Sequence, residues 1–181
     1  MHSQIKTVKK AILYMIISTF SFSLMNSFVK YLNHYPTFEI VFFRAIGSLV
    51  LGTALILIKG IPIFGNSRKL MIYRALVGLT AMSLFFMSLQ YLPVGTAVSL
   101  RYLAPIYAAM FAVFLLKEKL KPIQWFLFLF AFAGVLVLKG FDQNINTTGL
   151  LLVLAASVFS GLVYVLIRKI GNSDHPLVIV N

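Results

Sequence analysis

The sequence has no cysteine and only 4 acidic residues among its 181. Without cysteine, a disulfide scaffold and a thiolate metal site are both excluded. Charged residues make up 11% of the chain, whereas a soluble domain carries about 25%. Because 60% of the residues are hydrophobic, one globule of this size could not bury its apolar surface. The composition therefore excludes an ordinary soluble enzyme and a disordered tail, and it indicates an integral membrane protein.

The apolar residues form runs long enough to cross a bilayer, which takes roughly 20 residues per helix. Short linkers that contain charged residues, proline and glycine separate these runs. We therefore expect an all-α polytopic membrane protein with six transmembrane helices and the start of a seventh: Ala11–Val29, Thr37–Ile58, Leu70–Tyr91, Val94–Leu116, Pro122–Leu138, Thr148–Ile167 and Pro176–Asn181.

The net charge of +12 raises the question of a nucleic-acid partner. However, the lysines and arginines that produce this charge are spread over alternate linkers rather than gathered on one soluble module. Only Lys30 and Lys139 lie on one side of the predicted helices. Twelve lie on the other side: Lys6, Lys9, Lys10, Lys59, Arg68, Lys69, Arg74, Lys117, Lys119, Lys121, Arg168 and Lys169. The positive-inside rule then predicts that the N-terminus, residues 1–10, lies in the cytoplasm. Because the cations follow the membrane topology, we expect a lipid bilayer rather than nucleic acid as the partner.

The sequence contains no recognisable catalytic motif. His2, His34 and His175 are scattered in the N-terminus and the linkers, without Asp, Ser or Cys partners at motif spacing. A glycine-rich phosphate loop is also absent from the sequence. We therefore predict that the protein is not an enzyme and has neither a metal site nor a cofactor.

Two arginines are predicted to lie inside membrane spans, Arg44 in the second and Arg101 in the fourth. A charge in hydrocarbon is costly, so such residues usually serve a function. Each could attract an anionic or carboxylate-bearing solute, because a guanidinium matches carboxylate and phosphate groups. Each could instead snorkel or bind backbone carbonyls and so organise helix packing. Both interpretations stay open.

The first span carries a polar stripe, because Thr19, Ser23 and Asn26 fall within about 60° on a helical wheel. An unpaired amide is costly in lipid, so this stripe should face protein or a wet cavity. The three side chains are predicted either to hydrogen-bond a solute or to bond neighbouring helices.

The sixth span carries a face of small residues, which predicts close helix packing: Ala156, Ser157, Ser160 and Gly161. Tyr164 lies one turn further along the same helix and could reach a cavity. In the fourth span, Pro105 lies one turn after Arg101 and predicts a bend, with a gating hinge as a second interpretation. Glu118 lies among lysines and is predicted to be a structural charge on the cytoplasmic side.

The chain also matches itself weakly at an offset of 139 residues. Leu13, Ser18, Phe20, Ser21, Lys30 and Asn33 align with Leu152, Ser157, Phe159, Ser160, Lys169 and Asn172. Because this offset spans five predicted helices, the two copies would run in opposite directions through the membrane. An inverted repeat of this kind is typical of secondary transporters.

The order of spans and motifs resembles the EamA repeat of the drug/metabolite transporter superfamily. The residues that carry the resemblance are Phe42-Phe43-Arg44, Ala75 to Gly78, Leu92 to Ala97, Pro105, Glu118, Trp125 and Gly134-Val135. The resemblance implies a transporter of small metabolites with two inverted five-helix repeats, a 5+5 architecture, around a central cavity. It also implies that the fourth helix lines this cavity and that the second is peripheral.

On this interpretation, residues 11–140 form the first EamA-like repeat and residues 148–181 begin a second, incomplete one. We therefore expect a partial chain of a multi-pass transporter in the plasma membrane, the inner membrane of a bacterium, that works by alternating access. Two rival interpretations stay open. One is a half-size exporter that acts as a homodimer, and the other is a membrane scaffold or assembly protein that transports nothing.

Overall fold

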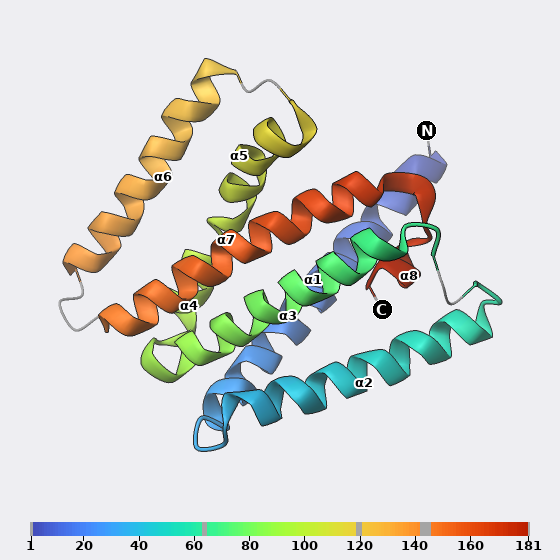
Figure 1. Ribbon diagram of the computed structural model, residues 1–181, viewed down its shortest axis with the longest axis horizontal. Coiled ribbons are helices and arrows are strands. Elements are labelled where there is room, and N and C mark those ends of the chain that lie inside the picture. The colour runs from blue at the N-terminus through green and yellow to red at the C-terminus, as the bar shows by residue number, and fades with distance from the viewer. Residues whose placement is uncertain (1, 63–64, 119–120, 142–145, 181) are drawn as a thin grey trace.

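The computed structural model describes residues 2–62, 65–118, 121–141 and 146–180. These residues are helical or lie in short turns, and none of them forms a strand. The helices are α1 (His2–Tyr31), α2 (Thr37–Ile58), α3 (Arg68–Tyr91), α4 (Val94–Arg101), α5 (Ala104–Leu116), α6 (Pro122–Phe141), α7 (Thr147–Ile170) and α8 (Pro176–Val180), with a short 3-10 turn at Gly171–Ser173. Figure 1 shows that α1, α2 and α3 run in alternating directions.

Five segments among the described residues are long and apolar enough to cross a membrane: Val8–Tyr31, Thr37–Ile58, Arg68–Tyr91, Val94–Leu116 and Thr147–Ile170. They confirm an all-helical polytopic membrane protein. In α6 the described apolar stretch, Pro122–Val135, is shorter than the others. The predicted spans at Pro122–Leu138 and from Pro176 onward, together with the inverted repeat, therefore stay predictions.

Helix α7 lies at the centre of the packing, against α3 and α5 (Figure 1). Its N-terminus is capped by Asn146, whose side-chain oxygen accepts hydrogen bonds from the backbone N–H groups of Thr148 at 2.8 Å and Gly149 at 3.3 Å. The predicted small-residue face brings α7 close to α5. A Cβ added at Gly161 would lie 2.8 Å from the backbone nitrogen of Ala108, so only glycine fits between these two helices.

The fourth predicted span is broken, as the position of Pro105 predicts. Helix α4 ends at Arg101 and α5 begins at Ala104. Pro105 lies in the first turn of α5, where its missing N–H costs little. The break leaves Arg101 at the end of a helix, directed at the space between α1, α3 and α7.

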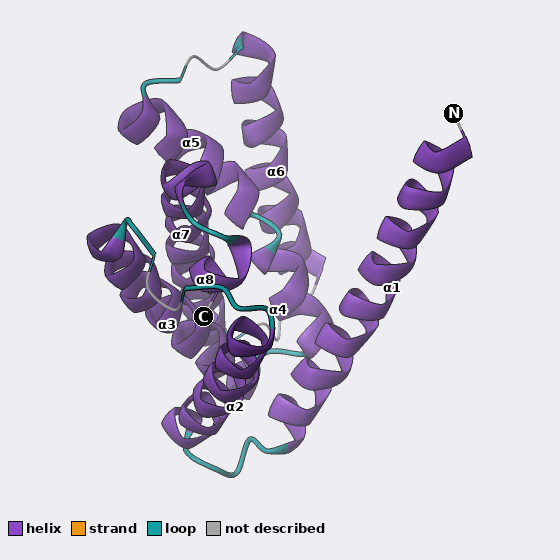
Figure 2. Ribbon diagram, turned by 90° about the vertical axis from the view of Figure 1, so that its right-hand side faces the viewer, coloured by secondary structure: helices purple, strands orange, loops and turns teal. Residues whose placement is uncertain are grey.

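Much of the apolar surface faces outward. Phe20 in α1, Phe43 in α2 and Phe130 in α6 are 69%, 71% and 64% exposed. Figure 2 shows that the N-terminal half of α1 stands away from the other helices. Because a soluble monomer rarely exposes such large apolar patches, these surfaces agree with a bilayer environment.

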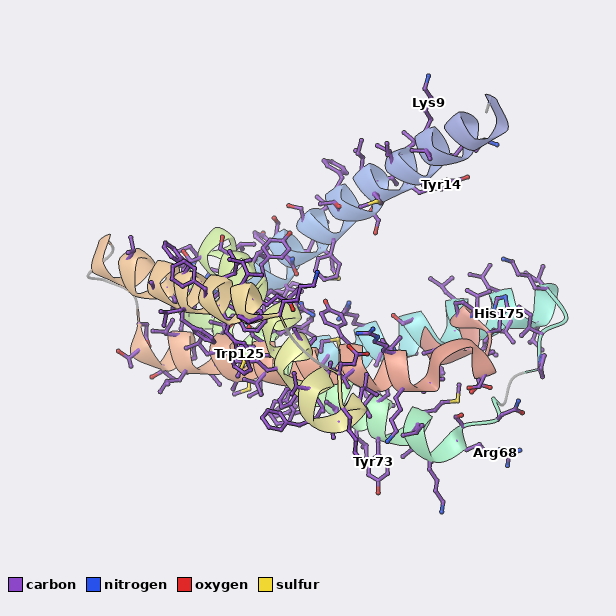
Figure 3. The ribbon with its side chains drawn as sticks, turned by 90° about the horizontal axis from the view of Figure 1, so that it is seen from above. Lys9, Tyr14, Arg68, Tyr73, Trp125 and His175 are labelled. Atoms are coloured by element: carbon purple, nitrogen blue, oxygen red, sulfur yellow. The ribbon has the colours of Figure 1, made fainter. Side chains whose placement is uncertain are left out.

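The charged linkers lie at the ends of the helices. Figure 3 shows Lys9, Arg68 and His175 toward the same end of the molecule. There the carboxylate of Asp174 accepts hydrogen bonds from the backbone N–H groups of Asn66, at 2.5 Å, and Ser67, at 3.2 Å. These bonds tie the α2–α3 linker to the turn after α7, and they lower the pKa of Asp174 below its usual range.

Glu118 has the structural contact that its position predicts. Its carboxylate accepts a hydrogen bond from Arg168 at 2.9 Å, so this ion pair joins the second residue after α5 to the last turn of α7. Both side chains are substantially exposed. The pair therefore connects two helix ends and takes no part in the cavities described below.

Candidate functional site

Five of the six residues predicted to bind a solute line a single cavity of about 460 Å³. Helices α1, α3, α4, α5 and α7 all contribute to its wall. The predicted residues found there are Thr19, Ser23, Asn26, Arg101 and Tyr164, together with the predicted hinge Pro105. Residues from the first and last long helices of the chain thus meet around one space, which we call the first cavity.

Arg101 is held in the first cavity by aromatic rings. Its guanidinium carbon lies 4.4 Å from the ring centroid of Phe85 in α3 and 5.7 Å from that of Phe22 in α1. Such cation–π contacts orient a guanidinium but carry no negative charge. The described residues that line the first cavity include no carboxylate, so an acidic ligand could form an ion pair with Arg101.

Asn26 presents an unpartnered polar atom. The residue is only 1% exposed, and its side-chain oxygen has no hydrogen-bond partner among the described residues. Buried polar groups are nearly always hydrogen-bonded. Asn26 therefore marks a position in the first cavity wall where a ligand or a water molecule would complete the bonding.

The two hydroxyl residues of the stripe lie one and two turns before Asn26. The hydroxyl of Thr19 donates to the carbonyl of Met15 within its own helix at 2.8 Å, which leaves its oxygen able to accept another bond. Ser23 also lines the cavity. All three residues of the polar stripe predicted on the first span thus line the first cavity, with Asn26 buried and Thr19 and Ser23 exposed.

Arg44 does not lie in the first cavity. It lines a second cavity of about 390 Å³, which lies between α2, α3 and α7 and includes Arg101 and Tyr164 in its wall. There the guanidinium of Arg44 contacts the sulfur of Met82, and its carbon lies 5.3 Å from the ring centroid of Phe86. Arg101 and Tyr164 therefore belong to both cavities.

Two residues of the site were not predicted from the sequence: Arg74, which lines the second cavity, and Phe85, which stacks on Arg101. Arg74 was counted with the linker cations. A signal for its position was present, because Arg74, Gly78 and Met82 follow a four-residue spacing that puts them on one helix face. Phe85 could not be distinguished from the many other phenylalanines without the fold.

Among the described residues, no group of three or more His, Cys, Asp or Glu side chains is placed to hold a metal ion. The two cavity linings offer cationic hydrogen-bond donors, hydroxyl and amide groups, and aromatic rings. The described lining residues include no His, Asp or Glu that could act as a base beside a serine.

Comparison with known proteins indicates a transporter family. Residues 9–139 match the model of the EamA-like transporter family. The pseudopaline exporter CntI of Pseudomonas aeruginosa is 26% identical over 176 residues, which cover 96% of this chain and 62% of that protein. The S-adenosylmethionine uptake transporter of Rickettsia prowazekii is 28% identical over 163 residues, which cover 88% and 55%.

A human protein, solute carrier family 35 member G1, is 25% identical over 175 residues, which cover 88% of this chain and 48% of that protein. The chain thus spans about half to three fifths of the length of these relatives. No solved structure matches it. The named relatives are transporters or solute carriers rather than enzymes.

Proposed function

This chain belongs to the EamA-like transporter family, and from this membership we propose that it binds a small acidic solute in the first cavity and moves it across the membrane. The observation that carries the proposal is the position of Arg101. It projects into a cavity whose wall carries polar side chains from α1 and α7 and, among the described residues, no carboxylate.

Arg101 would bind a carboxylate or a phosphate of the solute. A guanidinium forms paired, charge-assisted hydrogen bonds with such groups, and these are stronger than neutral ones. The rings of Phe22 and Phe85 hold the guanidinium, which reduces the entropy lost when a ligand binds. Positioned in this way, Arg101 would favour acidic over neutral solutes.

The α1 stripe would bind the polar remainder of the solute. The unpartnered oxygen of Asn26 can accept a hydrogen bond from an amine, amide or hydroxyl group. Thr19 and Tyr164 add hydroxyl groups to the lining of the same cavity. These convergent polar groups support transport over a scaffold role, for which an apolar lining would suffice.

The membrane arrangement that we propose follows the charge distribution. Residues 1–10 lie in the cytoplasm, the bilayer is the inner membrane of a bacterium, and the α2–α3, α5–α6 and α7–α8 linkers lie on the cytoplasmic side. Residues 11–140 are the first repeat and residues 148–181 begin the inverted second one. The solute site would then open alternately to either side.

Substitution of Arg101 tests the proposal in the protein expressed from its native gene. Arg101→Gln should reduce uptake of the transported acid at least about tenfold, because a charged hydrogen bond is lost, while membrane expression persists. Arg101→Lys should restore part of the activity, since it keeps the charge without the guanidinium fork. Lys59→Gln is the control, because Lys59 is exposed at the end of α2. Unchanged transport by Arg101→Gln would overturn the proposal.

A further inference from the structure

The second cavity gathers three arginines from three helices. Arg44 comes from α2, Arg74 from α3 and Arg101 from α4. The described residues that line this cavity include no aspartate or glutamate. Three like charges around one space repel each other, and burial of a charge is costly unless an opposite charge or hydrogen-bond acceptors compensate it.

The partners that the arginines have within the chain do not supply that charge. Arg44 contacts a thioether sulfur and an aromatic ring, and Arg101 lies over two rings. The Nε atom of Arg74 is buried and has no hydrogen-bond partner among the described residues. The cavity therefore holds a positive excess that these contacts do not neutralise.

Ser160 provides a second, independent sign of a ligand. It is 5% exposed on α7, it lines the same cavity, and its hydroxyl has no hydrogen-bond partner among the described residues. A hydroxyl donor beside guanidinium groups is a common arrangement around an acid group. The unpartnered donors of Arg74 and Ser160 thus lie in the same wall.

We propose that the second cavity binds an acid group, carboxylate or phosphate, and that the transported solute carries two such groups. One group pairs with Arg101 in the first cavity, and the other lies among Arg44, Arg74 and Ser160. Arg101 and Tyr164, which belong to both walls, join the two positions. This inference rests on the proposed function, which requires only the first group.

Binding measurements with dicarboxylates test the inference. The purified protein, in nanodiscs of phosphatidylcholine alone, is titrated with succinate, glutarate and adipate, each beside its monoamide. The diacid of the best-fitting length should bind about tenfold more tightly than its monoamide, because one charged hydrogen bond is added. Equal affinities for diacid and monoamide at all three lengths would overturn the inference.

The variant Arg74→Gln tests whether the second acid group binds in the second cavity. This variant should lose the preference for the diacid and keep the affinity for the monoamide. Lys69→Gln is the matched control, since it removes the same charge from an exposed position on the same helix and should keep the preference. If Arg74→Gln retains the preference, or if both variants lose it, the assignment is wrong. Should Arg74→Gln fail to fold, Ser160→Ala, a smaller change, replaces it with the same expectations.

Two further measurements distinguish a soluble diacid from a lipid headgroup, and failure of the inference from failure of the proposed function. Nanodiscs that contain phosphatidylglycerol show whether a lipid headgroup occupies the cavity. An unchanged diacid preference supports a soluble ligand. Loss of that preference in these nanodiscs, with the monoamide affinity unchanged, would assign the cavity to a lipid headgroup and overturn the inference. The proposed function is tested separately, by the transport of Arg101→Gln. If this variant has a transport defect but the unsubstituted protein shows no preference for diacids, only the second acid group is rejected.

Discussion

The ammonium group of Lys30 donates a hydrogen bond to the carbonyl oxygen of Leu89 at 2.5 Å and a second to that of Leu92 at 3.2 Å. Both carbonyls belong to the end of α3, where four carbonyls lack partners within the helix and the helix dipole is negative. Lys30 is one of only two cations on its side of the predicted membrane arrangement. The presence of a cation on this cation-poor side has a structural reason, because Lys30 caps the end of the neighbouring helix α3.

Removal of this cap should destabilise the protein. Lys30→Met keeps the apolar stem and removes the charge, so the free energy of unfolding should fall by about 1.5–3 kcal/mol, the range for a hydrogen bond to a charged group. Thermal unfolding in detergent measures the effect. Lys59→Met serves as the control because Lys59 is exposed. An equal, small change in both variants would contradict the capping role.

Packing of α7 gives a second prediction. Gly161→Ala should destabilise the protein by roughly 1–3 kcal/mol, the cost of overpacking, because the new Cβ would lie 2.8 Å from a backbone nitrogen and 2.9 Å from a backbone oxygen of α5. Gly47→Ala in α2 is the control, since nothing lies within 4 Å of its added Cβ. The melting temperature of Gly161→Ala should therefore fall below that of the unsubstituted protein, whereas that of Gly47→Ala should stay unchanged or rise. Equal melting temperatures would show that α5 can move away.

The stability that Asp174 adds by binding the α2–α3 linker should depend on pH. Its pKa is lowered by hydrogen bonds, first from the backbone of Asn66 and also from Ser67, so the folded state prefers the charged carboxylate. The stabilisation is therefore complete above the ordinary aspartate pKa of about 3.9 and is lost as the pH falls through the lowered value.

Asp174→Asn keeps an acceptor oxygen but removes the charge. It should lower the melting temperature at pH 7, and the difference from the unsubstituted protein should vanish in acid. Melting curves recorded from pH 7 down to about pH 2 follow this convergence. Glu39→Gln is the control, because Glu39 is an exposed carboxylate at the start of α2. A difference that persists undiminished in acid would exclude ionisation as its cause.

The sequence was sufficient for the features that follow helical periodicity. The stripe of Thr19, Ser23 and Asn26 was found because a polar face is conspicuous on an apolar helix, and the break near Pro105 because proline lacks an N–H. Arg101 stood out because charges are rare inside spans. Each signal lies within one helix, so it needed no knowledge of the partner helices.

The division of the site into two cavities could not be predicted, because it depends on how helices pack. The family resemblance implied that Arg101 lies on a cavity-lining helix and Arg44 on a peripheral one. It did not imply that α3 presents Phe85 to Arg101 and Phe86 to Arg44. Arg101 therefore lines both cavities, whereas Arg44 lines only the second of the two. Arg74 was hidden by its closeness to a helix end, where a cation normally reports topology rather than ligand binding.

The break at Pro105 leads to a prediction about movement. Pro105 cannot donate to the carbonyl of Arg101 four residues earlier, so the segment bends between α4 and α5. Pro105→Ala restores this donor and should straighten the segment. Because the bend places Arg101 in the cavity wall, transport should fall several-fold while the melting temperature stays unchanged or rises. Pro122→Ala, at the start of α6, is the control and should transport normally.

The absence of cysteine allows this bend to be measured directly. Spin labels attached through Ser99→Cys and Phe114→Cys, both exposed positions, report the distance across the break without removal of any native thiol. A straight helix would separate the two backbone positions by about 22 Å, and the bent segment should give a shorter distance that lengthens in Pro105→Ala. If transport falls while this distance stays the same, Pro105 acts through local contacts in the cavity and not as a hinge.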